Sequence, residues 1–242
     1  MSQSPPRLTR HHYFRALGLF MAGIAIEFLL LGGIGWVLEH VYLLGPTPID
    51  APLLQWFEVR ERKPFNNVML QITALGSVTV LTLLTALAFV AMVLAGRRRV
   101  ALSILVASLG ASVILTSVKR IVDRPRPFAA EVVARGLDQF VGDTHSYPSG
   151  HAMGSMAIYL MLGCLFAPLT PNRRCARFTI GAAVGMSLLI GMSRIYLGVH
   201  YPTDVLCGWI GGAFWAFITL RAFRLLDPQA EWLAQGSDKP GA

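Results

Sequence analysis

The sequence predicts an all-α fold: a polytopic membrane helical bundle with six transmembrane helices, formed by a single membrane domain over residues 1–242. Two features of the composition carry this prediction. Of the 242 residues, 54% are hydrophobic and 14% are charged, whereas soluble domains usually carry about 25% charged residues. The charged residues are also clustered, so that long apolar runs separate them. A run of about 20 apolar residues is enough to cross the hydrocarbon core of a bilayer.

Six apolar runs are the expected membrane spans. They cover residues 16–38, 68–95, 100–118, 151–168, 178–196 and 203–223. The first run follows three arginines, as the apolar part of a secretory signal peptide would. It is too long for a signal peptide and no small-residue cleavage site follows it, so we expect a retained helix. Glu27 lies inside this run and is either a functional carboxylate or a partner for another helix.

The polar connection over residues 45–65 is expected to contain a short helix. Asp50 would cap its first turn, and Leu53, Trp56 and Phe57 follow at helical spacing. A helix of this kind would suit the membrane interface. An ordinary helix packed on the protein fits the same pattern, so both interpretations stay open.

The distribution of basic residues predicts which connections face the cytoplasm. The amino terminus, residues 97–99, residues 171–177 and the carboxyl terminus are basic and alternate along the chain. Since short cytoplasmic loops carry an excess of Lys and Arg, these four segments are placed inside. The connections 45–65, 119–150 and 197–202 then face the opposite side. The short loops suggest a bacterial cytoplasmic (inner) membrane.

Three short stretches on the predicted outer side carry the residues of a candidate active site: 119–127, 148–151 and 193–204. Cations at the ends of spans are costly without an anionic partner, and arginine forks match phosphate oxygens. Ser149 is a good helix cap and Gly150 allows close backbone approach, so the start of the fourth span would add N–H donors. The expected phosphate-binding residues are Lys119, Arg126, Ser149, Gly150 and Arg194.

Two histidines and an aspartate would supply the reaction. His200 precedes Pro202, which suits the first turn of a helix, so Asp204 in that turn could reach one ring nitrogen of His200. The other nitrogen would attack, as in covalent catalysis. His151 would protonate a leaving group and then deprotonate water. Asp204 should raise the pKa of His200 and the cations should lower it; because the attacking ring must be neutral, activity should fall in acid.

Together, the three stretches resemble the signature of the type 2 phosphatidic acid phosphatase family. All eleven positions are present in order: Lys119, Arg126, Pro127, Pro148, Ser149, Gly150, His151, Ser193, Arg194, His200 and Asp204. The resemblance implies a helical bundle with its site at the outer membrane face. It also implies dephosphorylation through a phosphohistidine without metal or cofactor. In that reaction His200 is the nucleophile, Asp204 its orienting residue and His151 the general acid, while the five residues above hold the phosphate.

The leading functional hypothesis is a lipid phosphatase, a hydrolase of phosphoric monoesters or lipid pyrophosphates. Its expected partners are the membrane and a phospholipid or polyprenyl phosphate: phosphatidic acid, phosphatidylglycerophosphate, diacylglycerol pyrophosphate or undecaprenyl pyrophosphate. A lipid phosphotransferase using the same site is one alternative. A non-catalytic lipid-binding or transport protein is another, although transporters place their charges at the bilayer midplane. The basic residues behind the net charge of +8 are accounted for by the loops and the site, so nucleic acid is not an expected partner. No obligate protein partner is expected either.

Polar residues beside these stretches receive simpler interpretations. Arg120, Asp123 and Arg124 are expected to form structural ion pairs. Asp143 and His145 are expected in a solvated loop, with contact to substrate as the alternative. The connection that contains them would form a lid or recognise a head group. The three cysteines lack the spacing of a metal site, so neither a metal nor a disulfide is expected.

Overall fold

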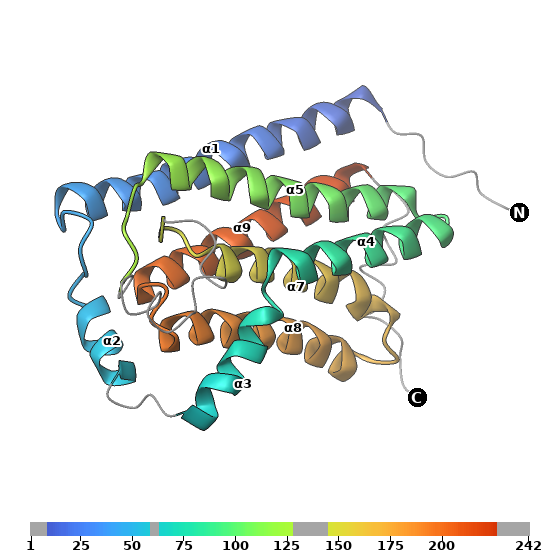
Figure 1. The fold of residues 1–242 in the computed structure, drawn as a ribbon. Coiled ribbons are helices and arrows are strands. Elements are labelled where there is room, and N and C mark those ends of the chain that lie inside the picture. The colour runs from blue at the N-terminus through green and yellow to red at the C-terminus, as the bar shows by residue number, and fades with distance from the viewer. Residues whose placement is uncertain (1–8, 59–62, 128–144, 227–242) are drawn as a thin grey trace, which may run out of the picture.

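The computed structural model describes residues 9–58, 63–127 and 145–226, and within these ranges it is helical and contains no strand. The helices are α1 (Arg10–His40), α2 (Asp50–Glu58), α3 (Lys63–Ala74), α4 (Val78–Leu94), α5 (Arg98–Ile121), α7 (Gly150–Phe166), α8 (Arg173–Tyr196) and α9 (Pro202–Leu226), with a 3-10 turn, η2, at Ala167–Leu169. The long helices lie side by side as one bundle (Figure 1). The predicted fold class is therefore confirmed.

Helix α7 is the centre of the bundle. It contacts α9, α8, α5 and α4, while α1 packs against α9 and α5. The short helices α2 and α3 lie at one end, at the lower left of Figure 1. At this end α1, α5 and α8 finish, and α7 and α9 begin. The helix ends that carry the three motif stretches therefore meet in one place.

The second predicted span is built from two helices rather than one. Five of the described helices are long and apolar enough to cross a membrane alone: α1, α5, α7 with η2, α8 and α9. The run 68–95 is divided between α3 and α4, where Phe65–Ala74 and Val78–Leu94 meet at a bend of 42° and pass the same test only together. Ser77 starts the new helix, since its hydroxyl accepts a hydrogen bond from the N–H of Val80 at 3.3 Å.

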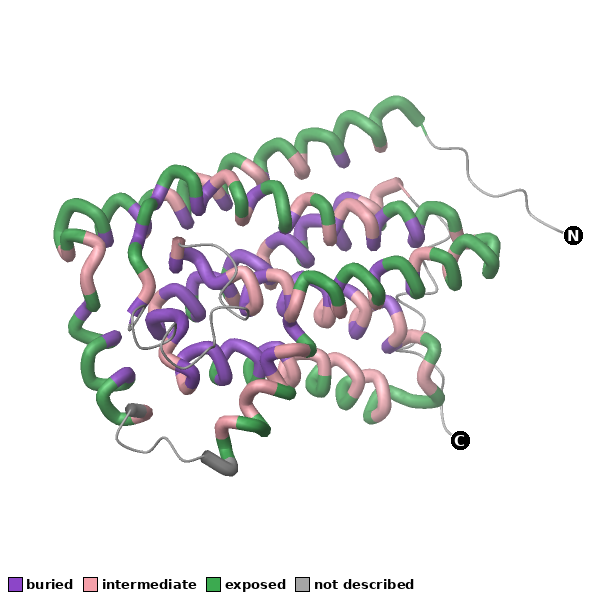
Figure 2. The backbone as a smooth tube through the Cα atoms, in the orientation of Figure 1, coloured by how far each residue is buried: buried purple, intermediate pink, exposed green. Residues whose placement is uncertain are grey.

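The outward faces of the bundle are apolar. Figure 2 shows buried residues gathered on α7 and α9, with exposed residues along the outer sides of α1, α4 and α5. Large hydrophobic side chains on these outer sides are exposed, among them Phe14, Leu29, Leu83 and Val113. Soluble proteins rarely expose continuous apolar surface on this scale. In a bilayer, this apolar surface would contact the apolar lipid tails.

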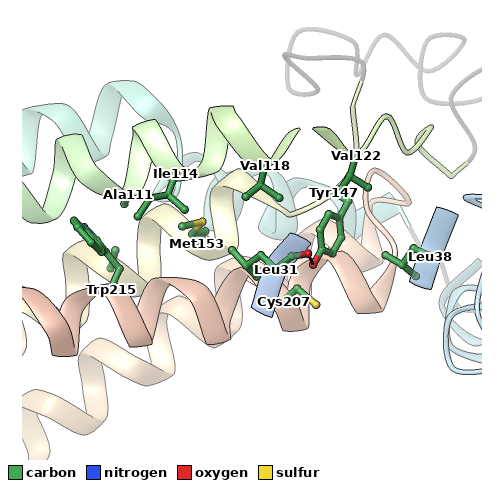
Figure 3. Packing of buried hydrophobic residues seen from close by; sticks show 11 residues of the cluster. Leu31, Leu38, Ala111, Ile114, Val118, Val122, Tyr147, Met153, Cys207 and Trp215 are labelled. Carbon is green, nitrogen blue, oxygen red and sulfur yellow. Dashed lines mark hydrogen bonds between the residues drawn. The ribbon is translucent and has the colours of Figure 1, made fainter. Parts of the chain in front are cut away.

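A buried tyrosine fixes the segment that leads into α7. Tyr147 is fully buried among Leu31, Val118, Met153 and Cys207 (Figure 3). Its hydroxyl donates a hydrogen bond to the carbonyl oxygen of Leu31 at 2.9 Å. Burial, helped by the neighbouring Cys207, raises the pKa of Tyr147, so the phenol stays protonated and can donate. The start of α7 is thereby anchored to α1.

Helices α7 and α9 approach each other closely at two glycines. A Cβ atom added to Gly208 would lie 2.7 Å from the carbonyl oxygen of Ser149, and one added to Gly212 would clash with the carbonyl oxygen of Met153. Small residues four positions apart allow helices to pack backbone against backbone. The N–H of Ser149 also donates to the carbonyl oxygen of Asp204 at 3.0 Å. The first turns of α7 and α9 are therefore held together.

Candidate active site

Four helices and the segments beside them, which carry Arg126, Ser149 and His200, bring the predicted site residues to the same end of the bundle. Lys119 lies in the last turn of α5, His151 in the first turn of α7, Arg194 in the last turn of α8 and Asp204 in the first turn of α9. His200 lies in the short connection between α8 and α9. One cavity of about 310 Å³ is lined, at its charged end, by Lys119, Arg126, Gly150, His151 and His200.

The two ring nitrogens of His200 face different partners. Nη1 of Arg126 lies 2.9 Å from Nε2 of His200. Arginine can only donate, so Nε2 accepts this hydrogen bond and carries the lone pair, which places the proton on Nδ1. Oδ2 of Asp204 lies 3.6 Å from Nδ1, a distance too long for a hydrogen bond. The predicted orienting pair is adjacent, but the direct hydrogen bond is not formed in this structure.

His200 is held in its neutral form. The ring is almost fully buried, with 1% exposure. Burial lowers the pKa of His200 well below its ordinary value, and the positive charges of Arg126, Arg194 and Lys119 lower it further. Of the two opposing effects expected from the sequence, the lowering effect prevails over that of Asp204. A neutral ring with a lone pair on Nε2 is the form that can attack phosphorus.

The cations of the site are held by the surrounding backbone and side chains. Nη1 of Arg126 also donates to the carbonyl oxygen of Val199 at 2.8 Å. Arg194 is fully buried and donates to Oγ1 of Thr73 at 2.9 Å. The described residues that line the cavity include no carboxylate. This concentration of positive charge, to which Lys119 adds, favours a multiply charged anion such as phosphate.

The start of α7 adds polar groups to the same cavity. Ser149 stands at the cap position of α7, as expected, but its side chain makes no capping hydrogen bond. Its buried hydroxyl has no hydrogen-bond partner among the described residues. The first N–H groups of a helix have no partner within it, which makes the helix start beside Gly150 suited to an anion. His151 is packed against the α3–α4 bend, where a Cβ atom on Gly76 would lie 3.2 Å from its Cδ2.

His145 contacts both Lys119 and Asp123. Its carbonyl oxygen accepts a hydrogen bond from Nζ of Lys119 at 2.6 Å, and its Nε2 lies 3.1 Å from Oδ1 of Asp123. The pairing expected for Asp123 is therefore made with a histidine. Asp143 and the other residues of 128–144 lie outside the described residues, and with them most of the stretch 128–147 that was expected to form a lid or recognise a head group.

Arg124 forms the ion pairs expected of it, but with partners that sequence reasoning did not identify. Its guanidinium lies 2.6 Å from Asp204 and 2.8 Å from Asp50, and all three side chains are fully buried. Asp50 is the first residue of α2 and accepts a hydrogen bond from the N–H of Thr47 at 3.0 Å. Thr73, the partner of Arg194, was also missed. Neither Asp50 nor Thr73 belongs to a motif, so only the fold reveals their contacts.

From its charged end the cavity continues between α4, α5 and α7. This part is lined by apolar and hydroxyl side chains, including Leu81, Thr82, Ser108, Ala111, Ser112, Leu115, Thr116 and Ile158. Ser108 and Lys119 are three turns apart on α5, about 16 Å along the helix. Among the described residues, no group of three or more His, Cys, Asp or Glu side chains is placed to hold a metal ion. The cavity therefore joins a cationic end to a largely apolar channel.

Comparison with known families decides the family of this chain. The model of the PAP2 superfamily matches residues 101–227, a range that contains all three motif stretches. This chain belongs to the PAP2 superfamily. The resemblance inferred from the eleven signature positions is thereby confirmed.

The relatives of this PAP2 protein are phosphatases. Undecaprenyl-diphosphatase of Sulfolobus acidocaldarius is 26% identical over 215 residues, which cover 88% of this chain and 92% of that protein. Undecaprenyl-diphosphatase BcrC of Bacillus subtilis is 38% identical over 105 residues, 43% of this chain and 48% of its own. Phosphatidylglycerophosphatase B of Bacillus subtilis is 30% identical over 103 residues, 41% and 46% of the two chains. The two Bacillus matches span about half of those proteins.

Solved structures share the fold of this PAP2 protein. The crystal structure of a transmembrane PAP2 type phosphatidylglycerolphosphate phosphatase from Bacillus subtilis superposes with a TM-score of 0.69 at 23% identity, covering 82% of this chain and 94% of that one. Aquifex aeolicus LpxE gives a TM-score of 0.52 at 21% identity, covering 72% and 96%. With five to six apolar spans of its own, the chain is an integral membrane protein. The predicted hydrolase class agrees with the names of its relatives.

Proposed function

We propose that this PAP2 protein is a metal-independent lipid phosphatase that hydrolyses a phosphate or pyrophosphate monoester through a phosphohistidine. One observation carries the proposal. A buried, neutral His200 turns the lone pair of Nε2 toward Arg126, in a cavity that it shares with His151 and Lys119. The proposed nucleophile, acid and anion-binding groups thus line one cavity.

Binding of the substrate phosphate would prepare the nucleophile. Lys119, Arg126 and Arg194 would hold the non-bridging oxygens, together with the start of α7 and its Ser149 hydroxyl. In the structure Arg126 donates to Nε2 of His200. Transfer of that hydrogen bond to a phosphate oxygen exposes the lone pair only once substrate is present.

In the first step, Nε2 of His200 attacks phosphorus opposite the bond to the lipid oxygen. The P–N bond forms, the P–O bond breaks, and His151, which enters this step as the imidazolium, gives its proton to the departing oxygen. The phosphorylated ring carries a positive charge and keeps its proton on Nδ1. Asp204, with Oδ2 at 3.6 Å from Nδ1, stabilises that charge.

In the second step, His151 takes a proton from a water molecule as the water attacks phosphorus. The P–N bond breaks, inorganic phosphate leaves, and Nε2 of His200 regains its lone pair. The balance is one lipid phosphate and one water consumed, with one lipid alcohol, or one lipid monophosphate from a pyrophosphate, and one phosphate released.

The lining of the cavity supports a lipid substrate. A phosphate at the cationic end places the adjoining tail between α4, α5 and α7, against Leu81, Ala111 and Ile158. Candidates are phosphatidic acid, phosphatidylglycerophosphate and undecaprenyl pyrophosphate. The Sulfolobus relative, which aligns over 88% of this chain, is named for the undecaprenyl substrate, and a Bacillus relative is named for phosphatidylglycerophosphate.

We place the protein in a bacterial cytoplasmic membrane with its site facing outward. Arg97, which precedes α5, and Arg173, which starts α8, belong to the end of the bundle opposite His200, and basic loops favour the cytoplasm. A membrane-impermeant maleimide added to cells should label an Ile121→Cys variant, since Ile121 is exposed near the site. It should not label native Cys175, in the first turn of α8. The reverse pattern would invert the orientation.

The decisive experiment measures phosphate release by detergent-purified protein in the presence of a chelator. Wild type, His200→Ala and His40→Ala would be tested on the candidate lipids. His40 is an exposed histidine at the end of α1 and serves as the matched control. We expect His200→Ala to reduce the rate about 1,000-fold or more, and His40→Ala to match wild type. Equal release by wild type and His200→Ala would show that the site is misassigned. No release without an added acceptor lipid would favour phosphotransfer.

A further inference from the structure

All N–H donors of the Arg124 guanidinium are hydrogen-bonded. It is fully buried, lies outside the cavity lining and belongs to the segment that follows α5. Its five N–H donors meet five acceptors, at 2.6 to 3.3 Å: Oδ1 of Asp204, Oδ2 of Asp50, Oγ1 of Thr203 and the carbonyl oxygens of Leu44 and Gly45. An arginine has no further donor to offer. The side chain therefore has one orientation, set by three separate segments.

Asp50 completes the same network from the amino-terminal side. Its Oδ1 accepts the backbone N–H of Thr203 at 2.9 Å, and its Oδ2 accepts the hydroxyl of Thr203 at 2.9 Å. Thr203 lies in the first turn of α9, so Asp50 caps this helix from α2. Burial works against its charge, but the N–H groups of Thr47 and Thr203 and the guanidinium of Arg124 lower the pKa of Asp50. Asp50 is therefore an anion at neutral pH.

Asp204 is held on both of its oxygens by these contacts. Oδ1 accepts from Nη1 of Arg124 at 2.6 Å, and Oδ2 accepts from the N–H of Tyr201 at 3.0 Å. The ring of Tyr201 is itself stacked beneath the guanidinium, 3.9 Å from its carbon to the ring centroid. The carboxylate that faces Nδ1 of His200 is thus fixed by the Arg124 side chain and by the backbone N–H of Tyr201.

We propose that Arg124 and Asp50 are positioning residues for the reaction, which fix the Asp204 carboxylate at Nδ1 of His200. The proposal rests on the proposed function, because it concerns the nucleophile assigned there. It adds a segment of the chain to the site, since Asp50 lies in α2, outside the family match of residues 101–227. Residues that orient the ligands of a metal site change activity by about 10- to 100-fold when they are removed, and we expect an effect of similar size for residues that orient Asp204.

A double-mutant cycle on the purified enzyme tests the proposal. Arg124→Gln and Asp50→Asn should each lower kcat about 10- to 100-fold with little change in KM, because phosphate binding is left to other side chains. In an Asp204→Asn background, Arg124→Gln should lower kcat by no more than about twofold further. Arg120→Gln, an exposed arginine on α5, is the matched control and should leave kcat unchanged. An equal loss from Arg124→Gln in both backgrounds would show a merely structural role and overturn the proposal.

A second measurement does not depend on turnover. In protein labelled with ¹³C-histidine, the imidazole signal of His200, assigned by its loss in His200→Ala, should move in Arg124→Gln and Asp50→Asn but not in Arg120→Gln. If wild type releases no phosphate from any lipid, the proposed function fails while this signal still decides the positioning role. An unchanged His200 signal in the folded Asp50→Asn variant would overturn the inference even if Arg124→Gln does not fold.

Discussion

The charge of His200 sets the pH range in which the protein can work. Because its folded pKa lies well below the ordinary value of about 6.5, the ring stays neutral from neutral pH into mild acid. We therefore expect protonation of His200 to reduce kcat/KM only below pH 6.5. The sequence predicted a fall of activity in acid, and the structure moves this fall to lower pH. The measurement is kcat/KM from about pH 5 to about pH 8, corrected for ionisation of the substrate phosphate. A limb at the ordinary imidazole value would contradict the buried environment of this ring.

The role of His151 can be separated from that of His200 by the leaving group. We expect His151→Asn to slow hydrolysis of a lipid phosphate by about 100- to 10,000-fold, because an alkoxide departs poorly without a proton. An aryl phosphate such as p-nitrophenyl phosphate needs no proton to depart, so its first step should be affected far less. Burst kinetics with both substrates would measure this. If His151→Asn slowed phosphorylation equally with both, His151 would not be the general acid.

At the residue scale, the sequence predicted those side chains whose identity and spacing form a signature. Lys119, His151 and His200 were found in this way, and the structure brings them to one cavity. Asp50 and Thr73 were not, because an aspartate in a polar connection and a threonine in an apolar run have no distinctive neighbours. Their meaning depends on partners more than 70 residues away that only folding brings near.

At the element scale, the bend between α3 and α4 was not predictable from apolar periodicity. Leu75, Gly76 and Ser77 do not interrupt the hydrophobic run, so residues 68–95 were taken as one span. Gly76 lies so close to Ile190 of α8 that a Cβ atom would clash with its side chain. The bend is thus a product of packing between helices, and it brings the chain against His151.

The contact between α7 and α9 gives an element-scale prediction. Gly208→Ala should lower the stability of the protein by about 1–3 kcal/mol, since the new Cβ meets the rigid carbonyl of Ser149 at 2.7 Å. It should also reduce activity, because the two helix starts carry His151 and Asp204. Thermal unfolding in detergent and phosphate release would measure the two effects. Gly181→Ala on α8 is the control, with no atom within 4 Å of its new Cβ; equal stability of the two variants would contradict the prediction.

At the scale of the whole molecule, the channel between α4, α5 and α7 should govern the preference for long tails. Ser112→Phe would narrow the channel beyond the charged end, so kcat/KM for a long-chain lipid should fall about 10-fold or more, while a water-soluble aryl phosphate should be hydrolysed as before. The measurement compares the two substrates. Leu109→Phe is the control, because Leu109 lies on the same helix with 63% of its surface exposed. Equal losses on both substrates would place the tail elsewhere.

The bundle as a whole was predictable because crossing a membrane requires little more than long apolar runs. The channel was not, because it depends on which small side chains from three helices face one another, among them Ala111 of α5 and Gly154 of α7. Apolar composition leaves these relative orientations open.

The channel has a consequence for how lipid preference diversifies. Reactive groups come from α5, α7, α8, α9 and the segments beside them, within residues 101–227, whereas one wall of the channel is Val78, Leu81 and Thr82 of α4, outside that range. One wall of the channel is thus encoded outside the stretch that carries the reactive groups, while α5 and α7 supply the rest of its lining. We expect substitutions on α4 to change the lipid preference while the reactive groups stay in place. Exchanging α4 between this chain and a relative named for another lipid would test whether this wall of the channel sets which lipid is dephosphorylated.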